Sequence, residues 1–182
     1  MQLTKITDNF FQITDAFTSA MLSRLVDEFE STDQWERLTA TDPSGHTRLQ
    51  LGIQLNSPLS HAINQALSPA VSFAENKLSH KLYQNSPQLW QDGPGYLNLP
   101  HQDFSPNLTV NIQVYLSASA TSDIGTWCFD QDEWHRVPYQ LNAGYIMFNP
   151  TELQHGMRNP VVDQRRSLYQ SYRATVVASD IW

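Results

Sequence analysis

The hydrophobic periodicity of this chain changes near residue 85, and this change constrains the fold more than any other feature of the sequence. Before it, apolar residues recur at helical spacing over 19–31 and again over 59–83, where Pro69 predicts a break or kink. A short apolar run at 9–13 predicts one strand ahead of these helices. After the change, short apolar or aromatic runs alternate with turn residues. The pattern predicts an α+β protein that is mainly β.

The predicted strands of the second half are short and closely spaced, which favours a barrel or a sandwich. They lie at 86–91, 96–104, 108–117, 125–129, 135–139, 144–150 and 165–177. The strand at 109–117 has the clearest alternation, because Val110, Ile112, Val114 and Leu116 share one face. Asn111, Gln113 and Tyr115 share the other face. A strand with one apolar and one polar face predicts a core on one side and a polar pocket on the other.

Charge and cysteine content exclude several classes of protein. The 182 residues include 11 Lys+Arg and 18 Asp+Glu, a net charge of −7, which argues against binding to nucleic acid or to anionic membranes. A single cysteine, Cys128, excludes an internal disulfide framework and a multi-cysteine metal site. We find no signal-like or membrane-spanning apolar run and expect a cytoplasmic protein.

A candidate metal site comes from two histidines and one aspartate. His101 and Asp103 are two positions apart on a predicted strand, so their side chains project from the same face. His155 follows the predicted strand at 144–150. Two imidazoles and one carboxylate can occupy one side of Fe(II) and leave the other side open. A surface pair of His101 with Asp103 and a structural role for His155 are the alternative interpretations.

An arginine near the end of the chain is the candidate partner for a second carboxylate. An organic dianion that binds iron through one end needs its other carboxylate neutralised, and the planar guanidinium of arginine suits that role. Strand alternation sends only one of Arg165 and Arg166 inward, and we favour Arg165 because it shares a face with Ser167. The hydroxyls of Tyr115 and Ser167 are candidates for further hydrogen bonds.

These motifs resemble the Fe(II)/2-oxoglutarate-dependent dioxygenase superfamily, and its prolyl-hydroxylase-like branch in particular. The residues that carry the resemblance are His101-x-Asp103, Tyr115-Leu116-Ser117, Gly125-Thr126, Gly144-Tyr145-Ile146-Met147-Phe148, His155-Gly156 and Arg165-x-Ser167-Leu168. The resemblance implies a double-stranded β-helix, a jelly-roll or cupin-like barrel, at 86–182. It also implies that 1–85 are supporting helices and that 1–182 form a single oxygenase domain.

The resemblance further implies a reaction and roles for the site residues. 2-Oxoglutarate is decarboxylated to succinate and CO₂ while O₂ supplies the oxygen that hydroxylates an unactivated C–H bond. His101, Asp103 and His155 would hold Fe(II). Arg165 would bind the distal carboxylate of 2-oxoglutarate, with Tyr115 and Ser167 assisting; Asn111 and Gln113 would line the pocket.

The substrate implied by the resemblance is a peptide or a small molecule, with peptidyl proline as one candidate. We expect the loops at 39–48, 117–126 and 130–137 to select it. Two other functions stay open: a metal-dependent cupin-like enzyme that does not use 2-oxoglutarate, and a β-barrel binding module without catalytic activity.

Overall fold

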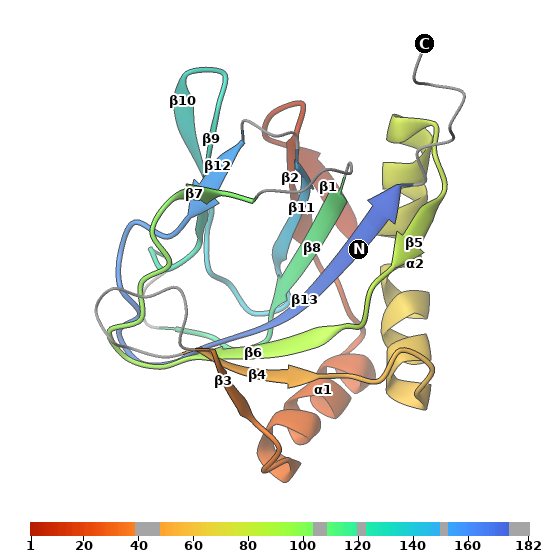
Figure 1. Ribbon diagram of the computed structural model, residues 1–182, viewed down its shortest axis with the longest axis vertical. Coiled ribbons are helices and arrows are strands. Elements are labelled where there is room, and N and C mark those ends of the chain that lie inside the picture. The colour runs from red at the N-terminus through yellow and green to blue at the C-terminus, as the bar shows by residue number, and fades with distance from the viewer. Residues whose placement is uncertain (39–47, 104–108, 120–122, 150–152, 175–182) are drawn as a thin grey trace.

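The computed structural model describes residues 1–38, 48–103, 109–119, 123–149 and 153–174. Its helices and two β-sheets form three layers, with the larger sheet between the helices and the smaller sheet (Figure 1). The site described below lies between the two sheets.

Among the described residues there are two helices, and each begins where a side-chain cap satisfies one of its first amides. Helix α1 (Ser19–Ser31) confirms the prediction for this segment, and the Thr18 side chain accepts a hydrogen bond from the Met21 amide. Helix α2 (Pro58–Leu78) is capped in the same way by Ser57. Neither helix, in the part of the chain that the structure describes, is long and apolar enough to cross a bilayer.

The break expected at Pro69 does not occur, because α2 continues through this residue. A proline inside a helix leaves the carbonyl four residues earlier without its amide donor. Here the Ser68 hydroxyl donates to the Gln65 carbonyl oxygen at 2.9 Å and replaces that donor. Pro69 is also exposed, so its ring does not disturb the packed face of the helix.

The helix predicted over 59–83 is too long at its C-terminal end. Helix α2 ends at Leu78, since Ser79 adopts a left-handed conformation with φ of 55°. The chain then enters a short strand, β5 (Leu82–Gln84).

The larger sheet has nine antiparallel strands in the order β1-β2-β11-β8-β13-β6-β4-β3, with β5 paired to β13. Its remaining strands are β1 (Gln2–Lys5), β2 (Phe10–Thr14), β3 (Glu36–Leu38), β4 (Arg48–Gly52), β6 (Gln88–Asp92), β8 (Thr109–Tyr115), β11 (Gly144–Asn149) and β13 (Arg165–Ala174). Strand β2 confirms the prediction at 9–13. Strands β1, β3, β4 and β5 were not expected in residues 1–85, which therefore supply strands as well as helices.

The smaller sheet has four antiparallel strands in the order β10-β9-β12-β7. They are β7 (His101–Gln102), β9 (Thr126–Asp130), β10 (Glu133–Val137) and β12 (Gln154–Gly156). The two sheets face each other and do not close into a barrel, so the barrel expectation is corrected to an open two-sheet form.

The strand predicted at 96–104 is confined, among its described residues, to His101–Gln102. The chain before it is held by backbone hydrogen bonds to the segment 157–161. The Gly95 amide donates to the Val161 carbonyl at 2.7 Å, and the Met157 amide donates to the Asn98 carbonyl at 2.6 Å. Residue 104 lies outside the described residues.

The two faces of β8 separate the core from the site, as its alternation predicts. Val110, Ile112 and Val114 are buried in a cluster that also contains residues of α1 and α2. On the opposite face, Tyr115 belongs to a second cluster between the sheets, together with Cys128 from the smaller sheet. A polar cavity lies beside this second cluster.

Candidate metal and co-substrate site

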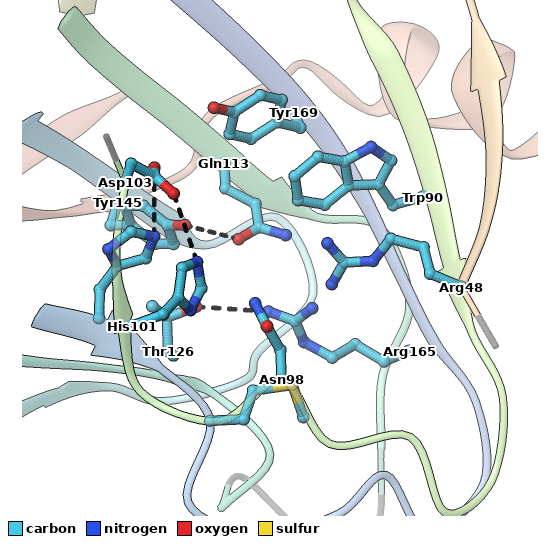
Figure 2. Close-up of a pocket in the computed structure, with 13 residues that line it drawn as sticks. Arg48, Trp90, Asn98, His101, Asp103, Gln113, Thr126, Tyr145, Arg165 and Tyr169 are labelled. Carbon is cyan, nitrogen blue, oxygen red and sulfur yellow. Dashed lines mark hydrogen bonds and ion pairs between the residues drawn. The ribbon is translucent and has the colours of Figure 1, made fainter. Parts of the chain in front are cut away.

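The structure brings His101, Asp103 and His155 together at one end of the smaller sheet. His101 and His155 are direct partners in the register of β7 and β12, and Asp103 follows the end of β7. The ligand atoms of all three lie within 4.8 Å of one another. Asp103 Oδ1 lies 3.3 Å from His101 Nε2, and Asp103 Oδ2 lies 3.5 Å from His155 Nε2 (Figure 2).

A glycine next to His155 allows this convergence. A Cβ on Gly156 would lie 2.7 Å from the Asn98 carbonyl oxygen, closer than a side-chain carbon can approach. Without it, β12 packs directly against the chain that leads into His101. The two imidazole rings end with their centroids 4.6 Å apart.

The hydrogen bonds and burial of these three groups turn metal-binding atoms toward one another. His101 Nδ1 donates to the Leu99 carbonyl oxygen at 2.9 Å, so Nε2 is the ring nitrogen that faces Asp103, and the hydrogen bond to this carboxylate raises the pKa of His101. Burial lowers the pKa of His155 to about 4, which keeps its imidazole neutral. The hydrogen bond from His101 lowers the pKa of Asp103 and keeps it ionised. A bound metal ion would take the place of the proton between His101 Nε2 and Asp103, and two imidazoles with one carboxylate form the donor set of non-haem Fe(II) sites.

A cavity of about 180 Å³ opens beside these three residues. Besides them, it is lined by Arg48, Trp90, Gln113, Thr126, Tyr145, Arg165 and Tyr169, among others (Figure 2). His101 and Asp103 lie on one side of the cavity, with His155 next to them, and the two arginines lie on the other side.

The arginine side of the cavity is built around one fully buried carboxylate. Asp92 Oδ1 lies 2.6 Å from Arg48 Nε, and Asp92 Oδ2 lies 3.1 Å from Arg48 Nη2. Asp92 Oδ2 also accepts from Arg165 Nη1 at 2.8 Å. Burial opposes the charge of Asp92, but the two arginines outweigh it and hold its pKa below the ordinary value. Two guanidinium groups share one carboxylate, so the cluster carries one uncompensated positive charge.

Arg165 faces the cavity and Arg166 does not. Arg165 is 2% exposed, and its Nη2 lies 3.3 Å from Thr126 Oγ1. The alternation of β13 turns Arg166 toward α1, where it pairs with Glu30 and lies over the ring of Phe29. The geometry agrees with the choice of Arg165.

Tyr115 and Ser167 lie next to the cavity without lining it. The Tyr115 hydroxyl donates to Thr126 Oγ1 at 2.9 Å and accepts from the Thr126 amide at 3.0 Å. Its ring lies 5.2 Å from the Arg165 guanidinium. Ser167 Oγ accepts from Gln113 Nε2 at 2.7 Å. Their direct contact with 2-oxoglutarate stays a prediction, whereas their contacts to Thr126, Arg165 and Gln113 are present.

The polar face of β8 turns toward the site, and of its two amide side chains Gln113 lines the cavity as predicted whereas Asn111 does not. Gln113 lines the cavity, and its Oε1 accepts from the Tyr145 hydroxyl at 2.7 Å. Asn111 Nδ2 lies 3.4 Å from Asp103 Oδ2 and so supports one member of the acid and imidazole group.

Sequence reasoning missed the other half of the arginine cluster. Arg48 follows a turn-rich segment, lies in a strand that no pattern predicted, and carries no motif signal. Asp92 opens an Asp-Gly-Pro-Gly sequence that is typical of a turn, yet it is the last residue of β6. A carboxylate directly after the strand predicted at 86–91 is the one signal that could have pointed to a buried ion pair.

Comparisons with known proteins agree with this fold. A prolyl-4-hydroxylase from Pseudomonas putida is similar over 91% of this chain and 92% of its own, with a TM-score of 0.74 at 13% identity. An oxidoreductase of the 2OG-Fe(II) oxygenase family from Burkholderia pseudomallei is similar over 91% and 85%, with a TM-score of 0.71 at 16% identity. HygX from Streptomyces hygroscopicus was solved with nickel, 2-oxoglutarate and hygromycin B. It is similar over 92% of this chain and 84% of its own, with a TM-score of 0.68 at 13% identity.

No family model and no curated protein matches the chain by sequence. At these identities the likeness confirms, at the level of the fold, the resemblance to 2-oxoglutarate oxygenases predicted from the sequence. Fold alone does not assign a reaction.

Proposed function

We propose that this protein is an Fe(II)- and 2-oxoglutarate-dependent dioxygenase, formed by a single domain over 1–182. It hydroxylates an unactivated C–H bond of a peptide or a small metabolite, with succinate and CO₂ as co-products. One observation carries the proposal: His101, Asp103 and His155 converge on one side of a cavity whose opposite side holds the buried Arg165. A fold shared with 2-oxoglutarate oxygenases supports it.

The residues of the cavity divide the work between its two sides. His101, Asp103 and His155 would hold the iron and leave its other positions free. Arg165 would bind the distal carboxylate of 2-oxoglutarate and so orient its other end toward the iron. When bound, iron and 2-oxoglutarate supply the oxidising chemistry, in which one oxygen atom of O₂ enters succinate and the other enters the substrate.

The remaining residues position these groups and limit access of water. Tyr115 would hold Thr126 against Arg165, and Ser167 would hold Gln113 toward Tyr145. Trp90 and Tyr169, which also line the cavity, stack with their ring centroids 4.2 Å apart and form an apolar wall for a substrate. Of the predicted selecting loops, 39–47 and 120–122 lie outside the described residues, and 133–137 form β10.

The test is an anaerobic titration of the Fe(II)-loaded protein with 2-oxoglutarate. A weak visible charge-transfer absorption should appear, and air should then release succinate. Asp103→Ala and His155→Ala should lose both signals. His135→Ala is the matched control, since His135 lies in the same row of the smaller sheet as His155 but outside the cavity lining.

Other outcomes would favour the alternative functions. Tight metal binding without any 2-oxoglutarate absorption would favour a cupin-like metal enzyme that does not use this co-substrate. Ligand binding with no succinate under any condition would favour a binding module. Full signals in His155→Ala would contradict the assigned metal site.

A further inference from the structure

We propose that Arg48 is a second binding residue for the distal carboxylate of 2-oxoglutarate, so that two arginines, not one, hold this group. The inference rests on the proposed function and adds a residue that the sequence motifs do not include. Arg48 comes from β4, a strand far from β13 in the chain, and lines the same cavity as Arg165 (Figure 2).

The shared carboxylate of Asp92 places the two guanidinium groups side by side. Arg48 Nη2 and Arg165 Nη1 both contact Asp92 Oδ2, at 3.1 and 2.8 Å. Because Arg48 bonds Asp92 through Nε and Nη2, its Nη1 points away from that carboxylate. Each Nη of a guanidinium carries two N–H groups, and Arg165 uses one on Nη1 for Asp92 and one on Nη2 for Thr126. Each arginine thus keeps donor capacity beyond its pairing with Asp92.

Arg48 is fixed in place before any ligand binds. Its guanidinium carbon lies 4.0 Å from the centroid of the Trp90 ring and 4.9 Å from that of Tyr96. Its side chain is 9% exposed. A guanidinium that is stacked and paired loses little conformational freedom on binding an anion.

The net positive charge of the arginine cluster favours the co-substrate, and not a charged substrate, as the molecule that it binds. Asp92 neutralises only one of the two arginines, so the cluster has room for one further negative charge. The metal side of the cavity would take the other end of 2-oxoglutarate, which leaves its distal carboxylate for this cluster. Because both arginines contact the same oxygen of Asp92, one carboxylate can reach both.

The experiment compares two ligands that differ only in the distal group. 2-Oxopentanoate has the same chain length as 2-oxoglutarate but ends in a methyl group. Both are titrated anaerobically into the Fe(II)-loaded protein, and the visible charge-transfer absorption gives each dissociation constant. Arg48→Gln should raise the dissociation constant of 2-oxoglutarate by roughly ten- to hundredfold and leave that of 2-oxopentanoate unchanged. Arg166→Gln is the matched control and should change neither constant.

A double variant separates contact from net charge. Arg48→Gln alone leaves the cluster neutral, whereas Arg48→Gln with Asp92→Asn restores one positive charge on Arg165. If Arg48 contacts the carboxylate, the double variant also binds 2-oxoglutarate weakly. Recovery of wild-type affinity in the double variant would overturn the inference, as would equal weakening of both ligands or no weakening in Arg48→Gln.

Failure of the inference is distinct from failure of the proposed function. If the wild-type protein gives no absorption with 2-oxoglutarate, the function itself is wrong. If the wild-type protein binds and Arg48→Gln binds equally well, only the role of Arg48 is wrong. Should Arg48→Gln not fold, Arg48→Lys tests the same difference, with a smaller selective loss of 2-oxoglutarate affinity expected.

Discussion

Asp92 is the single residue on which both cavity arginines depend. It is fully buried between Arg48 and Arg165, so replacing it with asparagine leaves two buried guanidinium groups without a counterion. We expect Asp92→Asn to lower the free energy of unfolding by about 3–5 kcal/mol, the cost of breaking a buried charge pair. Urea denaturation at pH 7 measures it.

The pH dependence of this effect has a definite sign. The folded-state pKa of Asp92 lies below its unfolded value, so its ionised form stabilises the fold above the unfolded pKa. The difference in the free energy of unfolding between the wild type and Asp92→Asn should therefore decrease as the pH falls below about 4. Asp123→Asn is the control, because its pair with Arg136 is on the surface and contributes about 0–1 kcal/mol. An equal loss in both variants would contradict a buried ion-pair cluster.

At the scale of elements, the sequence predicted the helices and strands that have a clear repeating pattern of apolar residues, and it missed elements without one. The faces of β8 followed from strict alternation, and α1 from helical spacing. Strand β3 has only three residues, and β4 follows a turn-rich segment and shows only two alternating apolar residues, Leu49 and Leu51, so Arg48 was missed along with its strand. The end of α2 depends on one residue in a left-handed conformation, Ser79, which no apolar pattern marks.

The residues of the candidate site fall into the same two groups, those that the local sequence predicted and those that it missed. His101, Asp103 and Arg165 belong to short motifs, and His101 and Arg165 lie in strands that their motifs predict. Asp92 reaches its partners only through the pairing of β6 with β4 and β13, which is a long-range contact. Such contacts are set by sheet order, and sheet order cannot be deduced from the local sequence.

Pro69 gives a prediction at the scale of one helix. An exposed proline in the middle of α2 costs helix stability, and Ser68 offsets part of that cost by its bond to the Gln65 carbonyl. Pro69→Ala restores the backbone donor and should raise the free energy of unfolding by about 1–3 kcal/mol. Ser68→Ala should destabilise the wild type by about 1 kcal/mol but have little effect beside Ala at position 69. Denaturant titrations of the four proteins measure both effects, and a destabilising Pro69→Ala would contradict this account.

At the scale of the whole molecule, the cavity lies between the two sheets, which Thr126 of the smaller sheet also links through its hydrogen bonds with Tyr115 and Arg165. His101 and His155 come from the smaller sheet, whereas Arg48 and Arg165 come from the larger one. A ligand that binds both groups at once connects the two layers. It must therefore stabilise the whole fold, since it binds the folded chain and not the unfolded one.

This connection predicts a cooperative thermal shift. Mn²⁺ stands in for Fe(II) because it takes the same ligands without reacting with oxygen during the melt. With Mn²⁺ and 2-oxoglutarate each near 100 times its dissociation constant, 2-oxoglutarate should add about 2.7 kcal/mol to the metal-bound protein. For a domain of this size that raises Tm by about 5–10 °C.

2-Oxoglutarate without metal should shift Tm far less, because only the arginine side then holds it. His155→Ala should show no combined shift from Mn²⁺ and 2-oxoglutarate. Addition of EDTA should leave the Tm of this variant unchanged. A full shift from 2-oxoglutarate in EDTA would mean that the dianion binds without the metal side, and the two-sided site would then be wrong.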